Sequence, residues 1–142
     1  MPPRLRVTRA GPGVTVQDRG RHGYLRYGVN ECGPMDWLAH ETANRALENP
    51  GDAASLEIAT GGVEVVCDDA PVRVAYAGGG FAWSHNGVRR PPAAVLQLRP
   101  GDRLAAGAGA WGAWTYLAVE GGIDVPRVLG SRSTHTRSEM GG

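Results

Sequence analysis

The sequence predicts a mainly β domain, a closed or nearly closed barrel, with one principal helix near residues 36–48. From Ser55 onward, apolar residues alternate with a period of two over several short segments, which is typical of strands. Glycine accounts for 22 of the 142 residues, and much of it is paired or tripled, as in tight turns. Many short strands joined by glycine turns are typical of barrels, and the length suits one domain spanning residues 1–142.

The first strands are predicted on either side of a glycine-proline turn. Residues 5–8 (LRVT) alternate as a short strand that ends before Gly11. Residues 14–17 (VTVQ) form a second candidate strand. This strand leads into a polar loop at residues 18–23, which contains glycines at two positions.

The helix is predicted from its cap, its apolar spacing and its stop signal. Asp36 is the expected N-cap, because a side-chain oxygen there can accept a hydrogen bond from the first turn. Pro50 disfavours helical geometry at Asn49 and ends the helix. The spacing of three and four residues predicts one apolar face made of Leu38, Ala39, Ala43, Ala46 and Leu47. His40 is not part of a zinc motif, because no second histidine follows four residues later, and it is expected at the surface of this helix.

The strand predicted after the helix contains one acidic residue, Glu57, between two apolar ones. Leu56 and Ile58 are placed on the apolar face, and Glu57 between them is expected to face solvent, with a buried functional acid as the alternative. A further strand at residues 63–65 (VEV) follows Gly61-Gly62, which resembles a hairpin turn.

The remaining strands are predicted by the same alternation. Apolar and polar residues alternate at 72–76, 94–98 and 114–119. The sequence HNG at 85–87 carries an Asn-Gly hairpin signal between two extended runs. Residues 128–142 are polar and without a period, so a loop is expected there. For the tryptophans at 83, 111 and 114, core packing is favoured over a pocket lining.

Composition excludes several functions of this chain acting alone. All 15 basic residues are arginine, so a P-loop for ATP, a Schiff base, and attached biotin or lipoate are excluded, because each needs a lysine. No cofactor is therefore expected on the chain by itself. The cysteines and histidines lack zinc-ligand spacing, so no metal is expected. A net charge of +1 offers no attraction for nucleic acid or an anionic membrane.

The expected location is the cytoplasm. The N-terminal residues lack the apolar region of a secretory signal, and no apolar run approaches the length needed to span a bilayer. The two cysteines are interpreted as unpaired thiols, which suits a reducing compartment.

Two loops carry the candidate binding residues. Gln17, Asp18 and Arg19 place an amide, an acid and a guanidinium at the end of a strand, where Arg19 could clamp a small amide or carboxylate. The alternative is a turn in which Asp18 caps backbone amides and pairs with Arg19. The second loop gathers hydroxyls and a cation that could hold an anion, or it is a solvated linker. Its candidate residues are Ser131, Arg132, Ser133 and Thr134.

Several separate segments resemble one protein family. TVQDRGRHGY at residues 15–24 is similar to the family's TVQDLGRxGY opening, with arginine where leucine is common. YGV at 27–29 and GPMD at 33–36 resemble its entry to the helix. AVEGGI at 118–123 and LGSRST at 129–134 resemble its later segments. The family is that of the 5-oxoprolinase C subunit, also called allophanate hydrolase subunit 2 or biotin-dependent carboxyltransferase subunit.

The resemblance implies a cyclophilin-like β-barrel and a chain that works with partners. Family members are about twice as long and have two related halves, so residues 1–142 are expected to correspond to the N-terminal half. The implied partners are the B subunit of the same complex and, for oxoprolinase, also its A subunit. The implied ligand is a small amide or lactam, and ATP is used by the assembled complex rather than bound here.

Three functions follow as hypotheses from the resemblance. The leading one is a non-autonomous subunit of an ATP-dependent 5-oxoprolinase, which opens the lactam of 5-oxoproline to glutamate. The second is a subunit for biotin-dependent carboxyl transfer to urea or a related amide, as in urea carboxylase and allophanate hydrolase systems. The third is a regulatory module, because relatives are described as antagonists of a kinase inhibitor. The catalytic residues stay unassigned.

Overall fold

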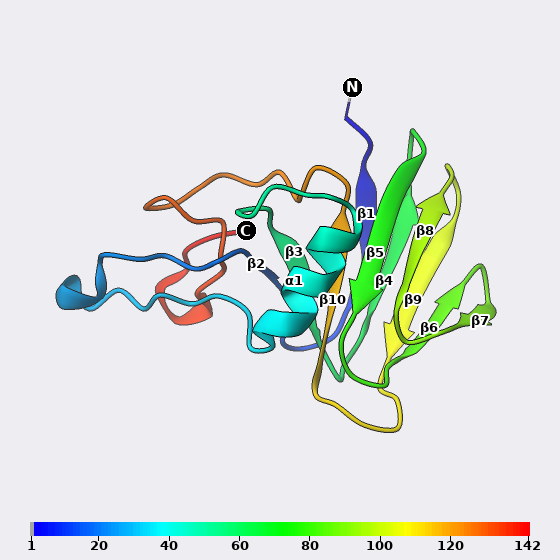
Figure 1. Ribbon diagram of the computed structural model, residues 1–142, viewed down its shortest axis with the longest axis horizontal. Coiled ribbons are helices and arrows are strands. Elements are labelled where there is room, and N and C mark those ends of the chain that lie inside the picture. The colour runs from blue at the N-terminus through cyan, green and yellow to red at the C-terminus, as the bar shows by residue number, and fades with distance from the viewer. Residues whose placement is uncertain (1) are drawn as a thin grey trace.

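Two five-stranded antiparallel sheets and one α-helix make up the computed structural model, which describes residues 2–142 (Figure 1). The first sheet has the order β1, β4, β9, β6, β7, with bounds Leu5–Ala10, Val63–Cys67, Arg103–Gly107, Ala82–His85 and Val88–Arg90. The second has the order β2, β3, β10, β5, β8, with bounds Thr15–Gln17, Ser55–Ala59, Trp114–Val119, Val72–Ala77 and Ala94–Leu98. The predicted mainly β class with one principal helix is confirmed.

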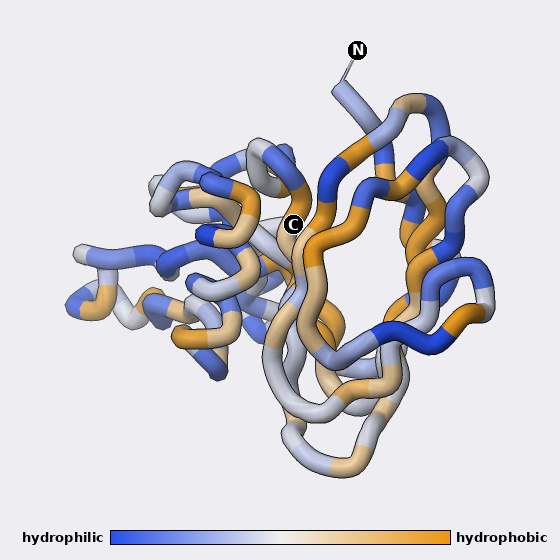
Figure 2. Tube along the Cα trace, turned by 45° about the vertical axis from the view of Figure 1, so that its right-hand side comes forward, coloured by the Kyte–Doolittle hydropathy of each residue, from blue (hydrophilic) through white to orange (hydrophobic). Residues whose placement is uncertain are grey.

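The hydrophobic core lies between the two sheets, whose traces curve into a ring with many apolar segments (Figure 2). Alternation along β5 explains how the core forms, since Val72, Val74 and Tyr76 all join the core cluster. Trp83 of β6, in the facing sheet, stacks on Tyr76 with ring centroids 3.9 Å apart. The two sheets are therefore closed over a core of aliphatic and stacked aromatic side chains.

Helix α1, Trp37–Ala46, covers the outer face of the second sheet. Here the strands present small residues, because Ala75 and Ala118 point away from the main core. They form a second buried cluster with Ala43 and Leu47 of the helical segment. The alanines allow the helix to lie close to the sheet, which matters for the site described below.

The helix confirms its predicted cap, but its buried face differs from the predicted one. The Asp36 side chain accepts a hydrogen bond from the backbone N–H of Ala39 at 3.0 Å. Leu38 is 75% exposed and Ala46 is exposed, so their placement on the apolar face was wrong. The buried stripe is rotated and includes two polar residues that find hydrogen-bond partners. These partnered polar residues are His40 and Asn44.

Two strand predictions also need correction. Gly61-Gly62 does not close a hairpin, because β3 and β4 belong to different sheets and the turn crosses between them. Strand β9 lies at the centre of the first sheet but was not predicted. Its sequence, RLAAG, has no β-branched or aromatic residue, so its strand signal is weak. The Asn-Gly hairpin is confirmed between β6 and β7, with positive φ at both Asn86 and Gly87.

The loops after β2 and after β10 lie together beside the sheets (Figure 1). The first contains a short 3₁₀ helix, Leu25–Tyr27, and the second another, Thr136–Ser138. The predicted loop at 128–142 holds two isolated bridges besides this turn. Within residues 2–142, no helix has the length and hydropathy needed to cross a membrane.

The same substitution should lower the free energy of unfolding much more in the core than at the surface. Leu117 of β10 is fully buried in the main core, so Leu117→Ala should lower the free energy of unfolding by about 2–5 kcal/mol. Leu38→Ala removes the same atoms from an exposed position and should change it by under about 0.5 kcal/mol. Chemical denaturation followed by circular dichroism measures both, and equal losses would contradict the described core.

Candidate functional site

The carboxylate of Asp18 joins the two predicted loops. Asp18 follows β2 and is 3% exposed. Its Oδ1 accepts hydrogen bonds from the hydroxyls of Ser131 at 2.6 Å and Ser133 at 2.8 Å, and from the Gly20 N–H at 2.9 Å. Its Oδ2 accepts from the backbone N–H of Arg132 at 2.7 Å. The two loops that carry the candidate binding residues therefore meet in one buried network.

Hydrogen bonding keeps Asp18 ionised despite its burial. Burial alone raises the pKa of Asp18, but the hydrogen bonds outweigh this effect and bring the pKa below its ordinary value. The donors are Ser131, Arg132, Gly20 and Ser133. A carboxylate with all of these donors is a structural anchor, and the hydroxyls bonded to it are directed away from solvent.

Arg21 is a second anchor of the same loop, and the only sequence signal for it was its place in the TVQDRGRHGY segment that resembles the family. Its side chain is completely buried and donates to the carbonyl oxygens of Val128 at 2.7 Å, Ser131 at 3.3 Å and Ser133 at 3.0 Å. Each of these bonds satisfies a backbone carbonyl that would otherwise be costly to bury. The guanidinium of Arg21 thus fixes the backbone conformation of residues 128–133.

Gln17 and Thr134 complete the junction. The amide nitrogen of Gln17 donates to the carbonyl oxygen of Thr134 at 3.2 Å, and its oxygen accepts from the Gly33 N–H at 3.1 Å. The Thr134 hydroxyl accepts from the N–H of Val16 at 3.2 Å. These contacts hold the GPMD segment at the entrance of α1 against β2. A binding role for Gln17 or Thr134 stays a prediction, since both are occupied by these contacts.

Arg19 points away from Asp18 and toward helix α1. Its guanidinium is 3.2 Å from Glu41 and lies over the ring of Trp37, 5.9 Å from the centroid. A Cβ at Gly51 would approach the guanidinium to 2.9 Å, so the arginine passes close above this glycine. The alternative in which Arg19 pairs with Asp18 is therefore not what the structure shows.

His40 is buried, so its predicted surface position was wrong. It is 2% exposed, and its Nδ1 is 2.9 Å from the Ser55 hydroxyl. Burial lowers the pKa of His40, and Arg19 lowers it further, although Glu41 and Asp18 act in the opposite direction. The imidazole is therefore neutral at pH 7, and its Nε2 has no hydrogen-bond partner within residues 2–142.

Arg19 and His40 line one small polar cavity of about 140 Å³. The cavity lies between the end of β2, helix α1 and the turn that follows the helix. Its other lining residues are Glu41, Asn44, Arg45, Asn49, Pro50 and Gly51. We call this space the Arg19–His40 cavity. A guanidinium and a neutral imidazole nitrogen facing it can bind a small molecule that carries both a carboxylate and an amide.

Glu57 is also buried, and the expectation that it faces solvent was wrong. It is 5% exposed, and its Oε2 accepts hydrogen bonds from the Tyr116 hydroxyl at 2.7 Å and the Met35 N–H at 2.8 Å. The Tyr116 oxygen accepts in turn from the Asp36 N–H at 2.8 Å. Burial raises the pKa of Tyr116, and Glu57 raises it further. This pair therefore fixes the start of α1 beside the cavity.

Arg132 lies apart from the Arg19–His40 cavity. Its Nε donates to the carbonyl oxygen of Val125 at 2.9 Å, and its guanidinium is 3.6 Å from Asp124. It lines a separate cavity of about 440 Å³ together with Asp52 and Arg127. A carboxylate-binding role for Arg132 stays a prediction. Within residues 2–142, no three histidine, cysteine, aspartate or glutamate side chains gather as metal ligands.

Comparisons with known proteins agree on one family. Residues 27–142 match the family described as "Carboxyltransferase domain, subdomain A and B". The chain belongs to the carboxyltransferase domain family. This carboxyltransferase-domain chain is 38% identical to the C subunit of 5-oxoprolinase from Escherichia coli over 97% of its own length, and spans 44% of that relative. It is 41% identical to the urea amidolyase of Lachancea kluyveri over 96% of its length, and spans 7% of that protein.

Solved structures of relatives share the fold. The crystal structure of TTHA0988 superposes with a TM-score of 0.90 at 31% identity, covering 99% of this chain and 52% of that one. The urea amidolyase of K. lactis superposes with a TM-score of 0.87 at 36% identity, covering 92% of this chain and 8% of that one. The carboxyltransferase-domain chain therefore spans about half, or much less, of the relatives it matches, which are subunits or parts of multidomain proteins.

Replacing Asp18 should destabilise the junction between the loops. Asp18→Asn retains the shape but loses an acceptor oxygen for buried donors, so the free energy of unfolding at pH 7 should fall by about 1–3 kcal/mol. Asp124→Asn changes an exposed carboxylate and should cost under about 0.5 kcal/mol. Because the folded pKa of Asp18 is lowered, its contribution is present above the unfolded pKa and is lost as pH falls through the folded value. Urea titrations at several pH values would reject the anchor if Asp18→Asn and Asp124→Asn behaved alike.

The burial of His40 should be visible in its titration. Its folded pKa is lowered, so NMR should give a midpoint below about 6.5 for this imidazole. The unfolded state binds the proton more readily, so stability due to the neutral ring is present above about 6.5 and is lost as pH falls through the folded pKa. His40→Gln should remove this pH dependence, whereas His135→Gln, a change nearer the surface, should keep it. A midpoint at or above the ordinary value would contradict the buried position.

Proposed function

We propose that this chain acts as a non-autonomous component of an ATP-dependent 5-oxoprolinase, in the position of its C subunit. The support is its similarity to the 5-oxoprolinase C subunits of Escherichia coli and Haemophilus influenzae, at 38% and 32% identity. The chain spans 44% and 41% of those two relatives, against 7% and 8% of the urea amidolyases. Because the chain has no lysine for a P-loop, a partner, either the B or the A subunit, would supply the nucleotide site.

The geometric support is the pairing of Arg19 with His40 around one small cavity. The substrate 5-oxoproline carries a carboxylate and a lactam amide. In the proposal, Arg19, which stands where the family commonly has leucine, is a contact particular to this chain and binds the carboxylate through N–H groups not used by Glu41. The neutral His40 ring exchanges a hydrogen bond with the lactam amide through Nε2, because Ser55 occupies Nδ1. A cavity of about 140 Å³ suits a compact, single-ring molecule.

Carboxyl transfer is a second candidate function, and one observation favours it. The urea amidolyase of Lachancea kluyveri is 41% identical to this chain, and a crystal structure of Kluyveromyces lactis urea carboxylase superposes with a TM-score of 0.87. In this alternative the cavity would hold urea or a related amide. The biotin would be carried by another chain, because this one has no lysine to which it could be attached.

Activity measured with and without partners tests the proposal. The purified chain alone, given ATP and 5-oxoproline, should release no glutamate, whereas the complex with its partner subunits should do so. In that complex, Arg19→Gln should lower kcat/KM at least about tenfold, since a charge-assisted contact to the substrate carboxylate is lost. The matched control is Arg73→Gln, because Arg73 is also half-exposed and pairs with one glutamate, Glu120, at 3.1 Å. It should retain kcat/KM within about twofold.

Each outcome assigns a function. Turnover by the chain alone would show that the non-autonomous role is wrong. Turnover of urea that requires a biotin carrier, with no glutamate release, would favour carboxyl transfer. Equal effects of Arg19→Gln and Arg73→Gln in an assembled complex would show that the Arg19–His40 cavity is not the substrate site.

A further inference from the structure

One ring nitrogen of His40 is available to a ligand in the Arg19–His40 cavity. The imidazole is 2% exposed. Its Nε2 has no hydrogen-bond partner within residues 2–142, yet it is not among the fully enclosed polar atoms that lack partners. The small surface that His40 retains therefore includes Nε2. Because His40 also lines the cavity, Nε2 is the ring nitrogen that a ligand there can reach.

The single proton of the Ser55 hydroxyl decides whether Nε2 carries a hydrogen atom. Ser55 is fully buried on β3, and its hydroxyl has no hydrogen-bond partner within residues 2–142 other than Nδ1 of His40. If Nδ1 carried the ring proton, the hydroxyl could only accept, and its own proton would be buried without an acceptor, which is costly. The favourable arrangement has Ser55 donating to Nδ1. In a neutral imidazole the ring proton is then on Nε2.

The other polar side chains that line the cavity have their acceptor atoms in use. The carboxylate of Glu41 pairs with Arg19 at 3.2 Å and with Arg45 at 2.8 Å. The side-chain oxygens of Asn44 and Asn49 each accept a hydrogen bond from an N–H group, at 2.9 Å and 2.8 Å. The wall therefore offers a ligand the N–H groups of two arginines and the Nε2–H of His40. Such a wall favours a ligand that presents acceptors.

We propose that Ser55 is a positioning residue that holds His40 in the Nε2–H tautomer, so that the cavity recognises its substrate by acceptor atoms alone. This assignment rests on the proposed function, in which the substrate is 5-oxoproline. Arg19 donates to the carboxylate, and His40 Nε2–H donates to the lactam carbonyl oxygen rather than accepting from the lactam N–H. A hydrogen bond to that oxygen also stabilises the negative charge that develops on it when the carbonyl carbon is attacked.

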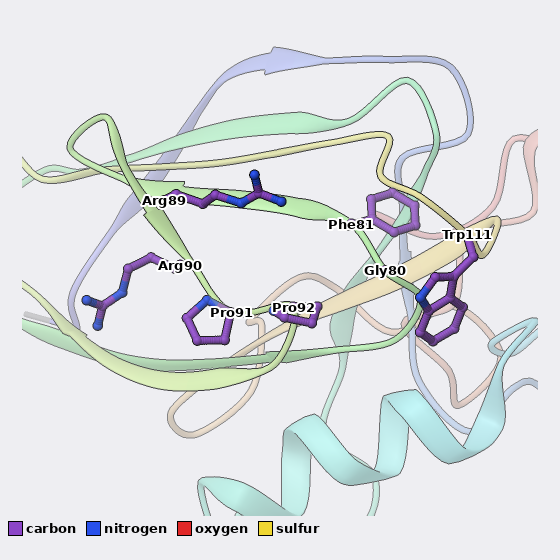
Figure 3. Close-up of a pocket in the computed structure, with 7 residues that line it drawn as sticks. All are labelled: Gly80, Phe81, Arg89, Arg90, Pro91, Pro92 and Trp111. Atoms are coloured by element: carbon purple, nitrogen blue, oxygen red, sulfur yellow. The ribbon is translucent and has the colours of Figure 1, made fainter.

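The cavity beside the β6–β7 hairpin has a wall of another kind (Figure 3). It is lined in part by Pro91, Pro92 and Trp111, and the Arg90 side chain points away from Trp111, beyond the two prolines. Trp111 is 67% exposed, so its expected place in the core was wrong. This cavity shares no lining residue with the Arg19–His40 cavity. Trp111 is therefore a control position for binding at the proposed substrate site.

Ring-nitrogen NMR of the full chain tests the tautomer without any ligand. Above the pKa of His40, Nε2 should resonate as a protonated nitrogen and Nδ1 as an unprotonated one. Ser55→Ala removes the donor, so both frequencies should move to intermediate values as two tautomers exchange. If Ser55→Ala does not fold, Ser55→Cys retains a weaker donor and should shift Nδ1 in the same direction. Ser84→Ala, at a half-buried serine on β6 in the other sheet, should leave both frequencies unchanged.

A series of ring carboxylates tests the direction of the hydrogen bond in the complex with its partner subunits. The lactone 5-oxotetrahydrofuran-2-carboxylate keeps the carbonyl oxygen of 5-oxoproline but has no N–H, and tetrahydrofuran-2-carboxylate has neither. As a competitor of 5-oxoproline turnover, the lactone should bind within about fivefold of the substrate, because it still presents an acceptor to Nε2–H. The saturated acid should bind at least about tenfold more weakly than the lactone, because Nε2–H is left without an acceptor.

Variants connect the ligand preference to the tautomer. In the complex, Ser55→Ala should reduce the preference for the lactone over the saturated acid at least about threefold, because His40 no longer presents a fixed donor. Trp111→Phe, at the separate cavity, should keep the preference within about twofold. A preference that stays the same in Ser55→Ala overturns the positioning role of Ser55.

The outcomes distinguish this assignment from the proposed function. A protonated Nε2 in the parent chain, together with a preference for the lactone, supports the assignment. A proton on Nδ1 overturns the role of Ser55, even if the complex hydrolyses 5-oxoproline. A saturated acid that binds as tightly as the lactone overturns recognition of the carbonyl oxygen, while the 5-oxoprolinase function stands. A complex that does not hydrolyse 5-oxoproline overturns the proposed function and the substrate contacts, whereas the tautomer measured in the chain is unaffected.

Discussion

The buried carboxylate of Asp18 is the interaction on which the arrangement of the loops depends. It accepts hydrogen bonds from Ser131 and Ser133, more than a hundred residues further along the chain. Arg21 holds the same segment by its carbonyl oxygens. Asp18 and Arg21 are close together in sequence, and they bind the same loop in opposite ways. Asp18 accepts hydrogen bonds from its donors, and Arg21 donates to its carbonyl oxygens. Since β2 ends at Gln17, this junction ties the loop after the last strand to the edge of a sheet.

The junction also decides where the charged side chains of the same segments point. With Asp18 directed inward, Arg19 leaves the chain on the other side and reaches helix α1 and Glu41. There it meets His40, which is buried because small alanines under the helix allow a close approach to the sheet. The arginine proposed to bind substrate and the anchoring acid are adjacent in sequence but belong to different environments. This separation is why the substrate proposal rests on Arg19 rather than on the whole polar loop.

Buried polar groups are treated differently in two regions of the molecule. Around helix α1, Glu57, Tyr116 and Ser55 each find a partner, and the helix start is held firmly as a result. Between β5, β6 and β7, the polar atoms of Tyr76, Trp83 and Arg90 have none within the described chain. The first set fixes the start of the helix, whereas the second leaves polar atoms unpaired in the core.

Local patterns in the sequence determined the mainly β class, the cap of the helix at Asp36, the Asn-Gly hairpin and the family, because each depends on neighbours in the chain. Strand β9 was not predicted, because its alanines and glycine have low β propensity. It forms a strand because β4 and β6 hydrogen-bond to it on both sides. The tertiary structure decided the burial of His40 and Glu57, because a polar residue is buried without a large cost only where it has a hydrogen-bond partner. Here the partners are Ser55 and Tyr116, which other strands supply. The direction of Asp18 was decided in the same way, because three of its four donors lie near the far end of the chain and no local pattern contains them.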